Sequence, residues 1–308
     1  MKSQAHNKIL NKKASMNIQC YLMLSVQLIG FLLITIYPII WALRLAWFSY
    51  DGVISNTRFV GWDNFVKIFT QDTTYWKTWL TTIKFALFKL PVELPLAMFL
   101  AVKLNKRLKG RGFFRAAFYL PNVVAVAIIG LIFSSMFDYF GIINAWLLKL
   151  GVIKERIDWF ANTGTAMFVL VAGSVWNTFG LNVLYFISAM QNIPEEMYES
   201  AHLDGASKSV VFFKITLPLM APVLQTILLL SLVGTLHTSD YVLVMTNGAP
   251  RGETFTVMSY IVNQFVPGFA DSVANIGYGC ALSLVTTVIM AAVAVIYNRL
   301  SAKMSDLY

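Results

Sequence analysis

The chain has 308 residues, of which 57% are apolar and 13% are charged, and its mean hydropathy is +0.65. Because an ordinary soluble domain carries about 25% charged residues, this composition argues against a soluble globular protein and indicates an integral membrane domain. The formal net charge is +9, but the basic residues flank apolar stretches and form no patch with interleaved aromatics, which argues against nucleic-acid binding.

Six apolar stretches each come near the about 20 residues needed to cross the hydrocarbon core of a bilayer. The first is longer than the apolar part of a secretion signal, and no cleavage pattern follows it soon, so we interpret it as an anchor. The sequence therefore predicts an all-α, polytopic protein with a membrane domain at residues 20–298 between tails at 1–19 and 299–308. The six stretches cover residues 21–47, 79–102, 114–136, 165–190, 219–245 and 276–297.

Lysine and arginine are distributed unequally between the two sets of loops. They are about twice as frequent in the tails and in the loops after the second and fourth stretches as in the remaining loops. Because cytoplasmic loops carry the excess of these residues, both termini and the loop after the fourth stretch are predicted to lie in the cytoplasm.

The second stretch contains two opposite charges. Lys89 and Glu93 are four residues apart and share one helix face, and Pro91 and Pro95 beside them are expected to kink or loosen the helix. Charged groups inside a membrane usually face a bundle interior or a water-filled cavity. The pair is either a self-neutralising ion pair that fixes helix packing or a hinge or gate that borders a transport pathway.

Three loops on the predicted outer side are richer in aromatic and apolar residues than linkers require. Residues 59–70, 141–160 and 253–266 are each expected to contain a short surface helix. Three tryptophans in these loops fit anchoring at the membrane–water interface: Trp62, Trp146 and Trp159.

Residues 193–218 form a polar insert between the fourth and fifth stretches, whereas packed helices are usually joined by 2–8 residues. Pro194 and the acidic residues after it suit the start of a first helix. Asp204 and Gly205 predict a turn, because glycine adopts positive φ readily, and Ser207 is expected to cap a second short helix.

This insert has two interpretations. It is either an amphipathic hairpin that lies on the lipid headgroups or a knob that inserts into a partner protein. The insert carries more acidic than basic residues, and anionic headgroups would repel such a face. The charge therefore favours a protein partner.

Sequence motifs for catalysis and metal binding are absent. No G-x-x-x-x-G-K-[ST] phosphate loop is present, so the chain is not predicted to bind ATP in the P-loop manner. His6, His202 and His237 are dispersed, and Cys20 and Cys280 are interpreted as packing residues within spans. We predict no catalytic residue and no metal site.

The insert carries the residues of a known loop motif: Glu199-Ser200-Ala201, Asp204-Gly205-Ala206, Phe213, Ile215, Leu217-Pro218 and Pro222. This pattern resembles the EAA loop of the membrane-spanning permease subunits of bacterial ATP-binding cassette importers. The chain departs at Ser200, where the family usually has alanine, but a small residue is kept. The start at Ile193-Pro194, with Tyr198 before the glutamate, resembles the carbohydrate, maltose-type branch. Weaker similarity covers residues 59–65, 118–121, 141–144, 240–241 and 246–250.

The resemblance implies a type I importer permease fold in a bacterial cytoplasmic membrane. It also implies a second permease subunit, related but different, two ATP-binding subunits and an extracytoplasmic sugar-binding protein that docks on outer loops. ATP and Mg would be held by the partner ATPase, and this chain would hold no cofactor. The residues expected to couple the hairpin to the ATPase are Glu199, Ala201, Asp204, Gly205, Ala206, Phe212, Phe213, Leu217 and Pro218.

In the sugar branch, parts of the fourth and fifth spans help to line a mid-membrane substrate cavity. Carried over, this implies a substrate path with hydroxyl-matching and aromatic groups at Trp176, Asn177, Asn182, His237, Asp240 and Tyr241. The alternative is that these side chains only join helices, as Asn, Ser and His commonly do in bundles.

The resemblance leaves the cargo open among an oligosaccharide, a monosaccharide and a glycerol-phosphate-type compound. A phosphate is expected to require extra Arg or Lys in the cavity, so the composition of the spans favours a neutral sugar. Outside this class, a secondary transporter is disfavoured because we find no internal repeat with paired broken helices. A membrane scaffold that uses the hairpin only for docking is the remaining alternative.

Overall fold

The computed structural model describes residues 19–105, 109–266 and 274–305. Most of the predicted N-terminal tail, part of the basic loop after the second stretch and the end of the C-terminal tail lie outside the described residues. The chain divides into two compact units. The first consists of residues up to 66 together with 275–284, and the second consists of 67–274 together with the residues from 285 onward.

The first unit begins with a helix that is long and apolar enough to cross a membrane, Gln19–Leu45. A π-helical turn, η1 (Leu32–Ile36), interrupts it before α2 (Tyr37–Leu45). Pro38 lies in the first turn of α2, and the widened turn accommodates its missing N–H and its ring.

A short antiparallel ribbon follows in the same unit, made of β1 (Phe48–Ser49), η2 (Ile54–Asn56) and β2 (Arg58–Phe59). Phe48 and Phe59 face each other across it with ring centroids 5.3 Å apart. Hydrogen bonds from the Asn56 side chain and the Val53 N–H hold the pKa of Asp51 below its ordinary value.

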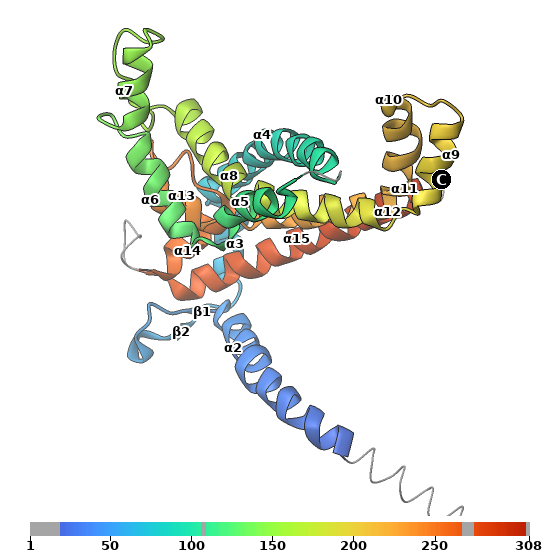
Figure 1. Cartoon of the computed structure of the whole chain (residues 1–308). Coiled ribbons are helices and arrows are strands. Elements are labelled where there is room, and N and C mark those ends of the chain that lie inside the picture. Colours follow the sequence, from blue (N-terminus) through green and yellow to red (C-terminus); the bar gives the residue numbers. More distant parts are fainter. Residues whose placement is uncertain (1–18, 106–108, 267–273, 306–308) are drawn as a thin grey trace, which may run out of the picture. The chain divides into compact units, whose positions relative to one another are not determined.

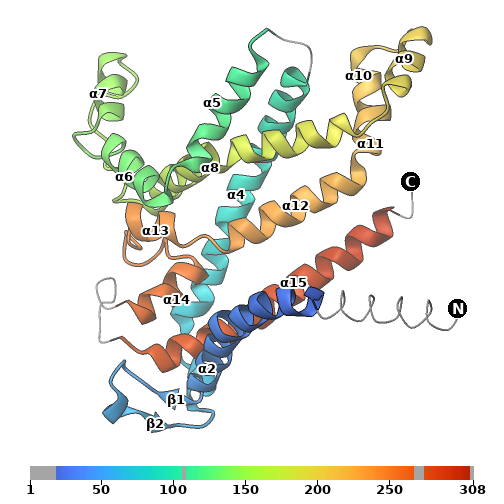
Figure 2. The same cartoon turned by 60° about the horizontal axis from the view of Figure 1, so that its bottom comes forward.

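The second unit is built around long helices (Figures 1 and 2). Helices α4 and α8 are each uninterrupted and pack against each other along much of their length. The two prolines that were expected to kink the second stretch, Pro91 and Pro95, lie inside the single helix α4. The helices of this unit up to the polar insert are α3 (Asp63–Thr70), whose first half belongs to the first unit, α4 (Thr73–Leu104), α5 (Arg111–Val123), α6 (Val126–Met136), α7 (Ile142–Lys149) and α8 (Thr163–Gln191).

The polar insert and the following segments complete the unit. Figures 1 and 2 show α9 and α10 side by side, at the end where α8 and α11 meet. The elements are α9 (Glu195–Leu203), α10 (Lys208–Val211), η3 (Phe212–Thr216), α11 (Leu217–Leu219), α12 (Ala221–Leu236), α13 (Asp240–Met245), α14 (Val257–Phe265) and α15 (Ile276–Ser305), whose first turns belong to the first unit.

The predicted third span is broken in the structure. Four helices of the described residues are long and apolar enough to cross a membrane, and the number rises to six if each of two bent helix pairs counts as one span. Helices α5 and α6 meet at 92°, because Val124 and Ala125 adopt extended dihedral angles. The nearby Pro121 gives little warning of this break, since proline disrupts the turn before itself and not the turn after it.

The predicted fifth span is also interrupted. Helix α12 ends at Leu236, and the chain leaves the helical path at 237–239 before α13 begins. The hydroxyls of Thr235 and Thr238 and the ring of His237 bond to carbonyl groups one turn back in α12. Such side-chain bonds to the backbone compete with helical continuation and account for a break at this polar run.

The three expected outer-loop helices are confirmed as α3, α7 and α14, but α14 is not a surface helix. Its Val257, Ser259 and Ile261 are buried, and α14 packs against α4. Trp159 is likewise half-buried, with its ring 5.1 Å from that of Phe137, which differs from the expected exposed anchor.

Candidate functional site

A cavity of about 430 Å³ lies between α4, α8, α12 and the break before α13. Its size falls within the range of small-molecule sites. Polar side chains project into it from three helices because hydroxyl and amide residues recur one turn apart on the inward faces of α8 and α12. The polar and charged residues that line it are Lys89, Glu93, Asn177, Thr178, Asn182, Ser231, Thr235, His237, Thr238, Ser239 and Asp240, together with Tyr185 and Tyr241.

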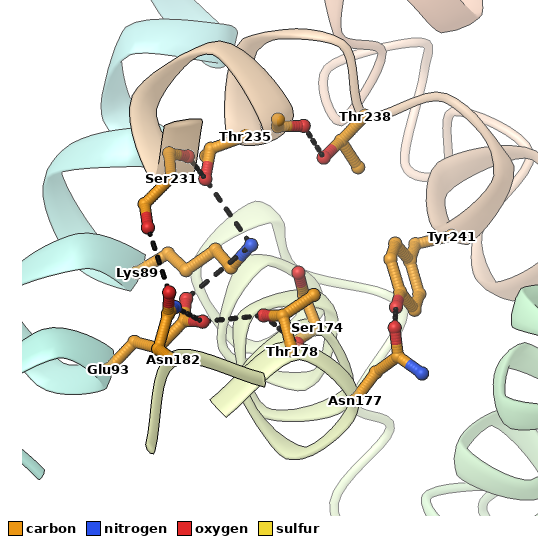
Figure 3. Close-up of polar contacts among 11 residues, drawn as sticks. Lys89, Glu93, Ser174, Asn177, Thr178, Asn182, Ser231, Thr235, Thr238 and Tyr241 are labelled. Atoms are coloured by element: carbon orange, nitrogen blue, oxygen red, sulfur yellow. Dashed lines mark hydrogen bonds and ion pairs between the residues drawn. The ribbon is translucent and has the colours of Figure 1, made fainter. Parts of the chain in front are cut away.

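Lys89 and Glu93 form a buried ion pair at the wall of this cavity (Figure 3). Their side chains are only 5% and 1% exposed, and Lys89 Nζ lies 3.5 Å from Glu93 Oε2. Glu93 Oε1 accepts hydrogen bonds of 2.7 Å from Thr178 Oγ1 and from Asn182 Nδ2. Lys89 Nζ donates to Thr235 Oγ1 over 3.3 Å.

This network joins three helices, because Lys89 and Glu93 stand on α4, Thr178 and Asn182 on α8, and Thr235 on α12. The charges nearly cancel, so the cavity wall carries dipoles and hydroxyls more than net charge. Uncompensated charges at this depth would be costly, which explains why the pair is held so closely. The contacts account for the packing interpretation, while a gating role stays a prediction.

Asn182, predicted to line the substrate path, is engaged on both sides of its amide. Its Nδ2 donates to Glu93, and its Oδ1 accepts a hydrogen bond of 3.2 Å from Ser231 Oγ on α12. The side chain therefore bridges α4 and α12 and offers few free hydrogen-bonding positions to a ligand.

Asn177 and Tyr241, two further predicted path residues, contact each other at the cavity wall (Figure 3). Tyr241 Oη donates to Asn177 Oδ1 over 2.5 Å, and Asn177 Nδ2 donates to the carbonyl oxygen of Pro121 over 2.6 Å. Both side chains are buried. The structure thus brings a residue of α8 together with one from α13 and one from the end of α5.

The residues at the α12–α13 break differ from these, because they keep free polar atoms at the cavity. His237 Nδ1 is bonded to the carbonyl oxygen of Val233 over 2.9 Å, which leaves Nε2 as an acceptor in the neutral ring. Ser239 Oγ donates to Asp240 Oδ1 over 2.8 Å, and His237 and Asp240 are exposed. A ligand in the cavity would meet these groups first.

Trp176, the remaining predicted path residue, does not line this cavity. Its side chain is 43% exposed and contributes to a separate apolar hollow between α4 and α8, together with Phe88, Val92 and Phe179. Neighbouring residues on a helix point about 100° apart, so the side chain next to Asn177 faces a different direction. The aromatic groups that do reach the polar cavity are Tyr185 and Tyr241.

The sequence interpretation missed three hydroxyl residues of the network: Thr178, Ser231 and Thr235. A signal was present in their spacing. Thr178 stands four residues before Asn182, and Ser231 four residues before Thr235, so each pair forms a polar stripe on an otherwise apolar helix.

The hairpin has the predicted turn. Gly205 adopts φ of +72°, and the Ala206 N–H donates to the carbonyl oxygen of Ala201 over 2.9 Å, which closes the end of α9. Ser207 caps α10, with its Oγ accepting from the Val210 N–H over 3.4 Å. The second arm is not one α-helix as expected, because the π-helical turn η3 interrupts it.

The hairpin residues predicted to contact a partner differ in exposure. Glu199, Asp204 and Gly205 are exposed, as is Phe213 at 64%, while Phe212, Ala206, Leu217 and Pro218 are half-buried. Ala201 is buried. The tip residue Leu203 is 89% exposed.

Comparison with known proteins decides the family. Residues 93–306 match the family described as binding-protein-dependent transport system inner membrane component. The chain belongs to this family. The matched part of the permease includes Glu93, the whole polar cavity apart from Lys89, and the hairpin, so the resemblance recognised in the hairpin motif is confirmed.

Curated relatives are similar in sequence to this permease over most of its length. It is 32% identical to the probable ABC transporter permease protein YesP of Bacillus subtilis over 93% of this chain and 91% of the relative. It is also 32% identical to the arabinooligosaccharides transport system permease protein AraP of the same organism, over 91% of this chain and 88% of the relative. The sn-glycerol-3-phosphate transport system permease protein UgpA of Escherichia coli O157:H7 is 34% identical over 80% of this chain and 83% of the relative.

A solved structure shares the fold of the permease. It is a bacterial ABC transporter involved in the import of the acidic polysaccharide alginate, which matches with a TM-score of 0.82 at 22% identity over 96% of this chain and 99% of that chain. The chain is therefore a multi-pass membrane subunit with the permease fold of an ATP-binding cassette importer.

Proposed function

We propose that this permease forms half of the translocation pathway of an ATP-driven, binding-protein-dependent importer for a neutral sugar. Relatives named as arabinooligosaccharide, lactose and trehalose/maltose permeases support a carbohydrate cargo. The cavity between α4, α8 and α12 is the place where that cargo would pass through this subunit.

The charge of the cavity wall is the observation that favours a neutral cargo. Lys89 is the one cation among the described lining residues, and Glu93 neutralises it at 3.5 Å. Asp240 adds a negative charge at the opening. A phosphate or uronate would meet repulsion without a compensating Arg or Lys, whereas sugar hydroxyls would find acceptors at Asp240 and His237.

The alternative cargo of the same importer class is a glycerol-phosphate-type compound. The relative UgpA, named for sn-glycerol-3-phosphate transport, supports it by similarity. Lys89 would then have to exchange Glu93 for the phosphate, and Glu93 would keep only its bonds from Thr178 and Asn182.

The hairpin 193–218 is proposed to couple transport to ATP hydrolysis in a partner. Its exposed residues combine apolar Leu203 and Phe213 with the acidic Glu199, which suits a protein cleft better than anionic headgroups. Two ATP-binding subunits would each receive one hairpin, one from this chain and one from a second, related permease subunit. ATP and Mg would be bound there, with no cofactor on this chain.

The membrane arrangement follows from the same proposal. The permease would cross the bacterial cytoplasmic membrane six times, with α5 and α6 as the third span, the segment from α12 to α13 as the fifth, and both termini in the cytoplasm. The outer loops would receive a sugar-loaded binding protein. A solved relative of the same fold was crystallised with an alginate pentasaccharide-bound periplasmic protein, which supports such a partner.

Uptake by cells tests the cargo. Cells that express this permease with its neighbouring importer genes are given labelled arabinooligosaccharide, lactose, maltose or sn-glycerol 3-phosphate. We expect ATP-dependent uptake of a neutral saccharide, and Asp240→Asn is expected to raise the half-saturating concentration about tenfold, since a charge-assisted hydrogen bond contributes about 1.5–3 kcal/mol. Uptake of glycerol phosphate alone would refute the neutral cargo, and uptake independent of the ATPase would refute the importer.

A further inference from the structure

The cavity wall contains two places where a predicted spanning helix is interrupted. Residues 124–125 separate α5 from α6, and residues 237–239 separate α12 from α13. Val126, at the first break, and Tyr241, just after the second, both line the cavity. At the first break the Val124 N–H donates to the carbonyl oxygen of Pro121 over 3.2 Å, which leaves that oxygen a second acceptor position for a group outside α5.

Asn177 on the uninterrupted helix α8 contacts both breaks. Its Nδ2 donates to the carbonyl oxygen of Pro121, in the last turn of α5, over 2.6 Å. Its Oδ1 accepts from the hydroxyl of Tyr241, in the first turn of α13, over 2.5 Å. Figure 3 shows the amide and the phenol meeting away from the Lys89–Glu93 network, so the two sets of contacts are separate.

Close backbone packing around Asn177 supports the same arrangement independently. A Cβ added at Gly180, one turn further along α8, would overlap the carbonyl oxygen of Phe118 in α5. A Cβ added at Gly130 in α6 would lie 2.8 Å from Val244 Cγ1 in α13. The absence of side chains at these two positions lets α5 approach α8 and lets α6 approach α13.

We infer that Asn177 is a positioning residue that fastens the two helix breaks to α8, and that it does not bind cargo. Its amide nitrogen and its amide oxygen each have a short bond to another helix, which uses one of the two donor hydrogens and one of the two acceptor positions. The outer segments α6 and α13, which pack on each other, are thereby held in one arrangement at the cavity wall. The role in transport rests on the function proposed above, whereas the fastening itself does not.

Thermal unfolding tests the fastening without any cargo. The full importer in lipid nanodiscs is compared with Asn177→Ala, Tyr241→Phe and the double variant. We expect Tyr241→Phe to lower the unfolding midpoint of this subunit by about 2–4 °C, as for the loss of one hydrogen bond of about 1 kcal/mol. Asn177→Ala loses two such bonds and should lower the midpoint by about 4–8 °C. In the double variant, Tyr241→Phe should add little to Asn177→Ala, because the shared bond is already gone.

Asn177→Asp provides a second variant of nearly unchanged size. It keeps the acceptor for Tyr241 but removes the donor to Pro121, so it should also lower the midpoint. Ser134→Ala is the matched control, since the Ser134 hydroxyl bonds only within α6, to the carbonyl of Leu131. Fully additive effects of Asn177→Ala and Tyr241→Phe, or midpoints equal to that of Ser134→Ala, would overturn the inference.

Transport kinetics distinguish positioning from cargo binding. With the saccharide identified by the uptake panel, Asn177→Ala and Tyr241→Phe should both reduce the maximal rate and leave the half-saturating concentration within about twofold. A tenfold rise of that concentration in Asn177→Ala with none in Tyr241→Phe would make Asn177 a cargo ligand and refute the inference. If the panel yields no saccharide, the proposed function fails, and the unfolding data still decide the fastening.

Discussion

At the residue scale, the Lys89–Glu93 pair shows how a charged group is accommodated in a membrane helix. Three donor groups lie beside the Glu93 carboxylate: the ammonium group of Lys89, the hydroxyl of Thr178 and the side-chain amide of Asn182. The Lys89 ammonium group contacts two acceptors, the Glu93 carboxylate and the hydroxyl of Thr235. The carboxylate is therefore better supported than the ammonium group. Because of this asymmetry, we expect the loss of Lys89 to destabilise the protein less than the loss of Glu93.

Single neutralisations of the pair should differ in severity. Glu93→Gln leaves a buried ammonium group without its counter-charge, and removal of one partner of a buried pair typically costs about 3–5 kcal/mol. Lys89→Met should cost less, because Thr178 and Asn182 still donate to the remaining carboxylate. Thermal unfolding of the importer in nanodiscs measures both, and the double variant should recover part of the loss. A double variant with the full sum of both losses would contradict an ion pair.

Individual residues also show how much of the site could be predicted from the sequence. The four-residue spacing of Lys89 and Glu93 placed them on one face, and the structure has them in contact. Trp176 lines a different hollow from Asn177, because neighbours on a helix point about 100° apart and adjacency in sequence does not give direction. The partners Thr178 and Thr235 required knowledge of which helices meet, which periodicity within one helix does not contain.

At the element scale, the proposed mechanism depends on the interrupted spans and on the hairpin. Hydropathy located the apolar stretches but not the breaks, since Val124 and Ala125 look like any other apolar residues of a span. The hairpin turn was predictable, because glycine after aspartate is a local signal that does not depend on packing. A turn that depends on local backbone preferences can thus be predicted from the sequence, whereas a helix break that other helices stabilise cannot.

Gly205 should be required for its backbone conformation alone. Its φ is +72°, and an added Cβ would meet no atom within 4 Å, so space does not restrict the side chain. Gly205→Val forces a β-branched residue into the left-handed region at a cost of about 1–2 kcal/mol or more. Co-purification of the ATPase subunits with the permease should fall in this variant.

Gly205→Asn is the matched control, because asparagine tolerates the left-handed region far better than valine does. It should keep most of the ATPase attachment. If Gly205→Val binds the ATPase as well as Gly205→Asn does, the turn is not part of the docking surface.

At the scale of the whole molecule, the proposal needs the hairpin and the outer loops on opposite sides of the membrane. Leu203 at the hairpin tip and Val152 after α7 are both exposed, which makes them suitable positions for labelling. With Cys20 and Cys280 replaced, Leu203→Cys should react with an impermeant maleimide only in inside-out vesicles. Val152→Cys should react only in intact cells or right-side-out vesicles, and the reverse pattern would overturn the topology.

ATP-driven uptake with an altered hairpin tests the central claim most directly. In liposomes that contain the complete importer, residues 194–216 of this permease are replaced by a Gly/Ser segment of equal length. Because the hairpin is the proposed contact through which ATPase closure moves the spans, we predict that ATP-dependent saccharide uptake falls to background while the two permease subunits still assemble. Full uptake by this variant would contradict the account.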